Sequence, residues 1–431
     1  MRKTRWCAIQ PLTGGMYLGT ENAVGHAAEF ILSYPGLGDV SKTDEAGNPV
    51  TAGNEYSLMK YLESKNDLPD YRVFNRKMFQ NDDDMNPEIM TTQWSKSDAP
   101  LDYSDMDLCI AVPVCAGLSQ ATIAKEDTKD QRNCNMIWIT KYALNAIKPK
   151  VYIFENAPTL MGHVGTGVRK NLEEIAKSAG YSIVYYKTDT KWHHNCQKRP
   201  RTFILFFRQD DMDSIQNPEL GYEHETLTID KYFDMIPEDA SQQVSFEVGY
   251  FNKALMSYYR DTFGDDYLDK VTYMADYMVT NNLYEDIIEY TGKSEEFTDK
   301  QKESIAKALR HIREKMETTG RYYSAIMFRP KDLMAHAVMF RMMQCEMHYK
   351  YERLYTVREC LWLMGHPHDF ELQGDVHKEY PKIGQNVPVK TAQWIVSQAL
   401  KNIDEKHNPT GAFVRYFNNN SMREEKYKQA V

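Results

Sequence analysis

The chain has 431 residues, enough for two or three domains with a sizeable hydrophobic core. Its 52 Lys and Arg residues are outnumbered by 61 Asp and Glu residues, and the net charge of -9 is opposite in sign to the basic excess typical of nucleic-acid binders, although it is compatible with a local basic cleft. Seven cysteines without a regular framework, no apolar run of membrane-spanning length and no signal-peptide pattern argue against secreted disulfide scaffolds and membrane proteins, and predict a soluble cytoplasmic protein.

The first predicted strand, residues 6–9, leads into a glycine turn. Thr13, Gly14 and Gly15 stand immediately before an apolar segment that is typical of a helix. Glycines at a strand-to-helix turn let the backbone approach a cofactor phosphate or a similar group closely. A single Gly-Gly pair is equally compatible with a simple tight turn, so the pattern alone does not identify a cofactor site.

The next stretch, residues 36–100, is rich in Gly, Asn, Asp and Lys and is interpreted as an insertion with a helical piece around residues 57–64. Its acidic run, Asp82-Asp83-Asp84, could suggest a metal site. Acidic runs are usually solvated loops, and we interpret this one in the same way.

Cys115 is the candidate nucleophile. The apolar run 108–112 predicts a buried strand, which Pro113 ends by fixing the backbone, and Cys115 follows two residues later with Ser119 close behind. The carboxyl ends of parallel strands are where open α/β sheets bind their ligands. The alternative is that Cys115 is only a small buried apolar residue.

Two later segments carry polar side chains next to predicted strands. The strand at 151–154 is followed by Glu155 and Asn156. A third strand, at 202–207, is preceded by three polar residues that alternate along the chain and would point to one side of a strand: Gln197, Arg199 and Arg201. Without Cys115, Glu155 and Arg199 would be interpreted as a buried ion pair between neighbouring strands.

A histidine- and cysteine-containing cluster lies just before these residues. His193, His194 and Cys196 could form half of a zinc site, but no second half follows at metal-ligand spacing. We therefore expect no metal, and we expect the histidines to pack locally or to contact nucleic acid.

Five segments, in this order, resemble the motifs of the cytosine-5 DNA methyltransferases. The resemblance covers roughly residues 1–208 and 346–400, and five motifs in the order of a family are far more specific than any single one. The matching segments are Pro113-Val114-Cys115 for the Pro-Pro-Cys loop, Glu155-Asn156-Ala157 for Glu-Asn-Val, Gln197 to Arg201 for Gln-x-Arg-x-Arg, Arg353 to Pro367 for a late block, and Ile383 to Pro388 for the final motif.

The resemblance implies an α/β fold with a doubly wound, mostly parallel sheet, of the Rossmann-like class I methyltransferase type. Residues 1–208 and 346–400 would form the catalytic domain, and residues 401–431 a loosely ordered tail. Residues 209–345 would be an inserted, largely helical target-recognition domain, although its helices could equally bind a protein partner. We predict helices there at 251–262, 267–279, 284–290 and 299–317, with Thr298 capping the last.

The resemblance also implies roles for the site residues. Cys115 would add to C6 of cytosine, Glu155 would bind N3 and the exocyclic amine, and Arg199 would donate to O2. The resemblance implies that further residues bind the substrate or hold the loops around it, namely Pro113, Ser119, Arg132, Asn156, Gln197 and Arg201. Of these, Arg132 would contact the DNA backbone, and Gln197 and Arg201 would hold the strand and loop in place.

The cofactor implied by the resemblance is S-adenosylmethionine. Its binding residues would be Thr13, Gly14 and Gly15 in the first motif and Gln385, Asn386 and Val387 in the final one. The first motif departs from the family pattern, because Gln10 replaces an aromatic residue and Leu12 a glycine. The acidic residue that ends the second strand in the family is also missing, and Asp39 is the nearest carboxylate downstream of that strand.

The expected function is methylation of C5 in a cytosine flipped out of double-stranded DNA, in a bacterium or a phage-infected cell. One alternative keeps Cys115 and Glu155 but uses methylenetetrahydrofolate, which would leave a 5-hydroxymethyl group; the altered first motif motivates it. RNA methylation is disfavoured by the large middle insertion. A catalytically inactive DNA- or protein-binding homologue is disfavoured because Cys115, Glu155, Gln197 and Arg199 are all present.

Overall fold

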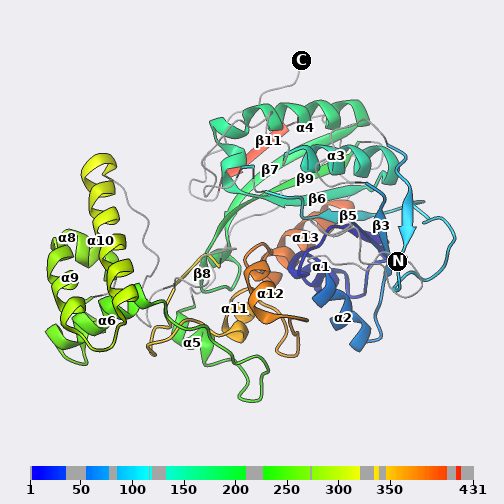
Figure 1. Ribbon diagram of the computed structural model, residues 1–431. Helices are drawn as coiled ribbons and strands as arrows, with labels where there is room; N and C mark the ends of the chain where they lie inside the picture. The colour runs from blue at the N-terminus through cyan, green and yellow to red at the C-terminus, as the bar shows by residue number, and fades with distance from the viewer. Residues whose placement is uncertain are drawn as a thin grey trace.

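The computed structural model describes residues 2–34, 55–76, 85–115, 117–118, 133–209, 227–271, 274–320, 334–338, 346–404 and 414–418. Within them, nine strands form one sheet in the order β11-β7-β9-β6-β5-β1-β2-β3-β4, with helices on both faces (Figure 1). The pairs β3–β2, β2–β1, β1–β5, β5–β6 and β11–β7 are parallel, whereas β9 runs antiparallel to both β6 and β7. The predicted doubly wound, mostly parallel sheet is confirmed.

The first half of the sheet grows outward from β1. Its elements are β1 (Trp6–Ile9), α1 (Gly15–Val24), β2 (Phe30–Ser33), α2 (Tyr56–Ser64), β3 (Asp70–Phe74) and β4 (Ile89–Thr91). The interpretation of residues 36–100 as an insertion was therefore wrong for its described part, because α2 and β3 belong to the sheet unit. Strand β3 was not predicted because it contains the charged residue Arg72, which a sequence pattern counts as exposed. In the structure Arg72 is buried, and its guanidinium is paired with the Asp70 carboxylate at 2.8 Å.

The second half of the sheet starts at β5, on the other side of β1. Its elements are β5 (Leu108–Ala111), α3 (Cys134–Tyr142) with a π-helical turn (Ala143–Ile147), β6 (Val151–Asn156), α4 (Thr166–Ala179), β7 (Tyr181–Asp189), β8 (Gln197–Lys198) and β9 (Pro200–Arg208), with short 3-10 turns at Pro158–Met161, His163–Gly165 and Thr190–Trp192. The chain reverses between β1 and β5, so the carboxyl ends of these strands form the switch point where ligands bind in such sheets.

Each face of the sheet is covered by its own hydrophobic cluster. One cluster joins alternate strand residues to α3 and α4, for example through Ile139 and Leu172. The other joins the opposite strand residues to α1, α2 and the C-terminal helices, for example through Met16, Leu58 and Ile395. This two-sided burial explains why β5 and β6 consist almost entirely of apolar residues.

A helical lobe lies apart from the sheet (Figure 1). It contains α6 (Tyr250–Phe263), α7 (Tyr267–Lys270), α8 (Met274–Thr280), α9 (Tyr284–Lys293) and α10 (Asp299–Thr319), and α5 (Ile229–Phe233) precedes it. Helices α6 to α10 share a separate hydrophobic cluster, whereas α5 packs into the cluster of the sheet body. The predicted Thr298 cap is confirmed, since its hydroxyl accepts from Gln301 N and completes a capping box.

The chain then returns to the sheet body. The short strand β10 (Ala335–His336) pairs with β8, and α11 (Val357–Leu363), α12 (Val376–Ile383) and α13 (Val389–Asp404) follow. The last of these packs along α1. The tail, expected to be loosely ordered, contributes the edge strand β11 (Val414–Asn418), which pairs with β7. No helix in the described ranges is long and apolar enough to span a bilayer.

Candidate active site

The loop after β5 holds Cys115 at the carboxyl edge of the sheet. Pro113 is buried, and the cysteine side chain is partly exposed. The backbone of the loop is fixed from α3, because Val114 N donates to the buried Asn135 Oδ1 at 3.2 Å. On its other side, Leu118 N donates to Cys115 O at 3.0 Å. The thiol is therefore carried on a loop with a defined backbone.

Glu155 lies at the end of the adjacent strand and faces a cation. It is 4% exposed, and its Oε1 atom lies 2.7 Å from Nε of Arg201. Strand β9 brings Arg201 there, because Glu155 pairs with Phe203 across the β6–β9 ladder. Burial raises the pKa of Glu155, and the nearby charges of Arg201 and Arg199 oppose that increase.

Cys115, Glu155 and the two arginines share one electrostatic environment. Burial raises the pKa of the Cys115 thiol, and the Glu155 carboxylate raises it further. The positive charges of Arg201 and Arg199 lower it but do not reverse the shift. The structure thus brings together the three elements that the sequence pointed to: the loop after β5, the end of β6 and the alternating arginines.

The two arginines differ in what they contact. Arg199 is buried, and its guanidinium donates to three backbone carbonyls, those of Val338, Gly384 and Asn386, the last two at 2.8 and 2.7 Å. Arg201 instead forms the ion pair with Glu155. The sequence-based expectation placed Arg199 at the base and gave Arg201 the role of holding the strand and loop; in the structure, Arg201 is the arginine that contacts Glu155, and Arg199 contacts backbone carbonyls. Alternation along the strand placed both side chains on one side but could not say which partner each one meets.

Gln197 and Asn156 are buried and have structural contacts. Gln197 Nε2 donates to Leu363 O at 3.0 Å, and its Oε1 accepts from Val338 N at 2.7 Å, which ties β8 to the returning chain. Asn156 Oδ1 accepts from Ala157 N at 2.9 Å. The other two predicted substrate-contacting residues, Ser119 and Arg132, lie outside the described residues.

The predicted cofactor residues form one compact network. Gly15 N donates to Asn386 Oδ1 at 2.9 Å, and the same oxygen accepts from Val387 N at 3.1 Å. Thr13 Oγ1 donates to Lys382 O at 3.2 Å. A Cβ atom added at Gly15 would overlap the carbonyl oxygen of Val387. The two segments to which the sequence analysis assigned cofactor binding are in direct contact.

Gly14 and Gln385 complete this set. Gly14 has φ of 97°, a left-handed conformation that favours glycine, and its N–H donates to Pro11 O. Gln385 N donates to Lys382 O at 3.0 Å in the turn that precedes Asn386. The glycine turn and the final motif are therefore held against each other.

His366 joins the same network and was missed from the sequence. It is fully buried, and its Nε2 atom lies 3.0 Å from Asn386 Nδ2 and 3.2 Å from Thr13 O. Burial lowers its pKa to about 4, so the ring is neutral at physiological pH. His366 lies in the late segment Arg353 to Pro367, which was used only for the family resemblance. No spacing pattern in the sequence linked this histidine to Thr13.

The histidine- and cysteine-containing cluster is used for packing. His193 Nε2 lies 2.9 Å from Thr188 Oγ1, its ring lies 5.4 Å from that of Trp394, and Cys196 is buried. Across the described ranges, no group of three His, Cys, Asp or Glu side chains is arranged to hold a metal ion. Asp82-Asp83-Asp84 lies outside those ranges.

Comparisons with known proteins were made for both sequence and structure. The family model for C-5 cytosine-specific DNA methylases matches residues 74–401. The Type II methyltransferase M.Bsp6I of Bacillus sp. (strain RFL6) is 31% identical over 108 residues, and the match covers 25% of this chain and 34% of that relative. The chain thus matches about a third of the relative's length.

Among solved structures, the fold is similar to that of a protein assigned as a DNA modification methyltransferase and encoded within a prophage (E. coli). The TM-score is 0.54 at 15% identity, and the superposition covers 93% of this chain and 100% of the other. At this identity the likeness concerns the fold alone, which is the Rossmann-like class I methyltransferase fold. Because the family model spans more than half of the sequence, the chain belongs to the C-5 cytosine-specific DNA methylase family.

Proposed function

We propose that this protein is an enzyme that methylates C5 of cytosine in double-stranded DNA, with Cys115 as the nucleophile. The observation that carries the proposal is the shared environment of the Cys115 thiol and the Glu155–Arg201 ion pair at the carboxyl ends of β5 and β6. A nucleophile, a buried acid and a fixed cation are the groups that addition to a pyrimidine ring requires.

The chemistry begins with the thiolate of Cys115. Cytosine C5 is a poor nucleophile, and formation of a bond between sulfur and C6 converts C5 into an enamine carbon. After C5 takes up the methyl group, a base removes the C5 proton, and the sulfur–C6 bond breaks to release the thiolate. The nucleotide must leave the base stack before any of these steps, because C6 is inaccessible within a duplex.

Glu155 supplies the acid in this scheme. In the free protein the Glu155 carboxylate is paired with Arg201, and burial raises its pKa, so the group can take up a proton when the base binds and donate it in a hydrogen bond to N3 as negative charge develops on the ring. Arg201 fixes the orientation of this carboxyl through Nε and is the guanidinium placed beside it, so we assign to Arg201 the contact with O2. Arg199, bound to three backbone carbonyls, is assigned a positioning role.

S-adenosylmethionine is the donor that we propose, and it supplies an electrophilic methyl group. The residues at the β1–β2 end of the sheet fit its adenosine moiety, since a buried carboxyl group, that of Glu55, is hydrogen-bonded to Ser33 at the end of β2. The buried Leu12 side chain stands where a glycine was expected, which keeps methylenetetrahydrofolate as the alternative donor. The alternative product is 5-hydroxymethylcytosine.

Covalent trapping tests the nucleophile. In DNA that contains 5-fluorocytosine, fluorine cannot leave C5 as a cation, so the protein–DNA bond persists after transfer. We expect the wild-type protein with S-adenosylmethionine to form a denaturant-stable adduct, and Cys115→Ser to form none. An adduct formed equally by Cys115→Ser would refute the assignment of the nucleophile.

The donor is tested by mass spectrometry of nucleosides from DNA that was incubated with each candidate. Labelled 5-methylcytosine from S-adenosylmethionine is expected. A 5-hydroxymethyl product that depends on methylenetetrahydrofolate would show that the folate is the donor. The assignment of Cys115 as the nucleophile would be unaffected. Unmodified DNA with both donors, together with no adduct, would instead identify an inactive binding homologue.

A further inference from the structure

A buried carboxyl group that the proposed base chemistry does not use lies at the carboxyl edge of the sheet. Glu55 immediately precedes α2 and is 2% exposed. Its carboxyl group accepts hydrogen bonds from its own backbone N–H, from the hydroxyl of Ser33 and from the backbone N–H of Leu12. Leu12 belongs to the loop after β1, and Ser33 is the last residue of β2. One side chain from α2 therefore spans the ends of two neighbouring strands.

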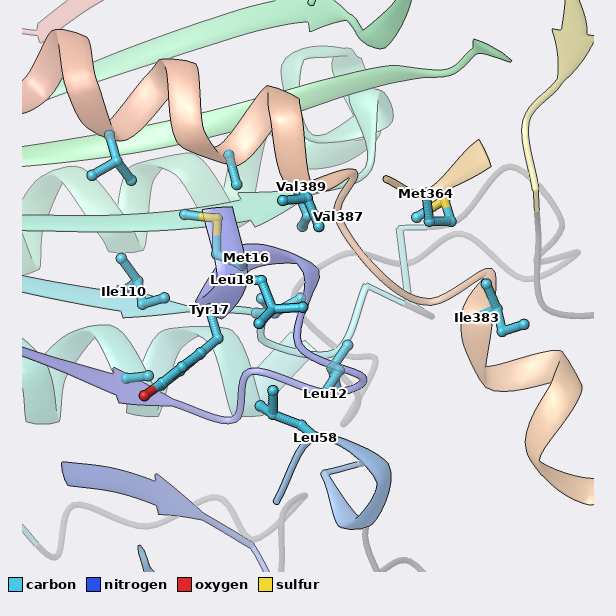
Figure 2. Packing of buried hydrophobic residues seen from close by; sticks show 14 of the residues in the cluster. Leu12, Met16, Tyr17, Leu18, Leu58, Ile110, Met364, Ile383, Val387 and Val389 are labelled. Carbon is cyan, nitrogen blue, oxygen red and sulfur yellow. The ribbon is translucent and has the colours of Figure 1, made fainter. Parts of the chain in front are cut away.

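The first turn of α2 fixes this side chain in place. Met59 N donates to Glu55 O at 2.9 Å, and Gln373 N donates to Ser57 Oγ at 3.0 Å. Figure 2 shows Leu58 beside Leu12, and a Cβ atom added at Gly14 would collide with the Leu58 side chain. The helix is thus packed directly on the glycine turn, and the Glu55 carboxyl cannot move away without unpacking it.

Such a position is unfavourable for a carboxylate unless a partner uses it. Burial raises the pKa of Glu55 to about 7, and the positive charge of Lys382 opposes this shift only in part. Strand β2 ends in Ser33, with Tyr34 next, and so provides no acid of its own. In doubly wound sheets, a nucleoside ligand lies across these strand ends, and a carboxylate accepts hydrogen bonds from its ribose hydroxyls.

We propose that Glu55, delivered from α2, is the residue that binds the ribose hydroxyls of the adenosine donor. The proposal rests on S-adenosylmethionine being the donor, as proposed above. It assigns the acid to a helix outside β2, which explains how the site can bind ribose although β2 ends without a carboxylate. The backbone N–H groups of Glu55 and Leu12 and the hydroxyl of Ser33 hold the carboxyl group, and its oxygens keep acceptor capacity for the ribose hydroxyls.

Calorimetric binding of S-adenosylhomocysteine to the DNA-free full-length protein tests this assignment. We expect Glu55→Gln to weaken binding by about 10- to 100-fold, the effect of losing hydrogen bonds to a charged acceptor. Glu63→Gln is the matched control: Glu63 lies in the same helix, its carboxylate is exposed and paired with Lys60, and its substitution should leave the affinity unchanged.

Analogues of the ligand separate ribose binding from general damage to the site. The 2′-deoxy and 3′-deoxy analogues of S-adenosylhomocysteine should bind the wild-type protein more weakly than the parent compound. They should also lose little further affinity in Glu55→Gln, because the hydrogen bond is already absent. Equal wild-type affinity for all three compounds would overturn the proposal without any variant.

The remaining outcomes are also decisive. Unchanged or tighter binding by Glu55→Gln would mean that the carboxyl group only fills space, and the proposal would be wrong. No binding of S-adenosylhomocysteine to the wild-type protein would remove both the donor and the role of Glu55. In that case, trapping of Cys115 on 5-fluorocytosine DNA, with the folate as donor, would still report separately on the base chemistry.

Discussion

At the scale of single residues, the Cys115 thiol is kept protonated in the free protein. Burial and the Glu155 carboxylate raise its pKa above the ordinary value of 9.0, so the thiolate fraction at neutral pH is small. Alkylation requires the thiolate, and its rate should still rise with pH near pH 9, where the rate for a thiol of ordinary pKa begins to level off. Iodoacetamide labelling of Cys115, followed by peptide mass spectrometry, measures this dependence.

Two variants should shift this alkylation rate in opposite directions. Glu155→Gln removes the charge that raises the thiol pKa, so alkylation at a fixed pH near 8 should become several-fold faster although methylation is lost. Arg201→Met removes a charge that lowers the pKa, and alkylation should become slower. Two results would contradict these charge effects on the Cys115 pKa. One is an alkylation rate of the wild type that stops rising with pH well below pH 9, and the other is a change of the rate in the same direction in both variants.

The candidate site was partly visible in the sequence at this scale. Cys115 and Glu155 each follow an apolar run, so the parallel-sheet rule alone placed them at one edge. The different contacts of Arg199 and Arg201 could not be predicted. The alternating pattern predicts on which side of the strand the two side chains lie, but not which group each of them contacts. Glu55 was missed entirely, because it reaches the strand ends from a helix and no spacing pattern links it to Ser33.

At the scale of elements, the loop between β1 and α1 is clamped by the segment that leads into α13. Gly15 lies so close to Val387 that an added Cβ atom would overlap the Val387 carbonyl oxygen. Gly15→Ala should therefore lower the free energy of unfolding by several kcal/mol, of the order of other overpacking substitutions, and weaken binding of S-adenosylhomocysteine. Chemical denaturation and calorimetry measure the two effects.

Gly292→Ala is the matched control for this substitution. Gly292 also lies in a helix, α9, and a Cβ atom there would meet nothing within 4 Å. Alanine is the better helix former, so this variant should be neutral or more stable by up to about 1 kcal/mol. Equal effects of the two substitutions would show that helix propensity, and not the contact with Val387, governs the Gly15 position.

Apolar periodicity predicted most elements, and buried charge explains the main exception. Strands β5 and β6 are continuous apolar runs, and α10 has a cap and a clear amphipathic pattern, so they were predictable. Strand β3 carries Asp70 and Arg72, which neutralise each other within the sheet unit, and a sequence pattern counts both as solvent-exposed. A local ion pair thus concealed a strand of the main sheet.

At the scale of the whole molecule, the negative charge is concentrated in the middle segment. Residues 209–345 contain 26 Asp and Glu against 15 Lys and Arg, whereas the rest of the chain contains 35 against 37. The rest of the chain is therefore nearly neutral with a slight basic excess, although the whole chain has a net charge of -9. Because the proposed substrate, DNA, is a polyanion, we expect its phosphates to be contacted mainly by residues outside 209–345, with little contribution from the acidic helical lobe.

The salt dependence of DNA binding tests this distribution. Neutralising two lysines of the segment that leads from β7 to β9, Lys191→Gln with Lys198→Gln, should reduce the slope of log affinity against log salt concentration by up to about two, since each phosphate contact contributes about 0.9. Neutralising two exposed lysines of α10, Lys300→Gln with Lys307→Gln, should leave the slope unchanged. Fluorescence anisotropy with one duplex across a KCl series measures both pairs. A smaller slope for the α10 pair would mean that the lobe contacts DNA phosphates despite its negative charge. An unchanged slope for the Lys191 and Lys198 pair would mean that these two lysines do not contact DNA phosphates.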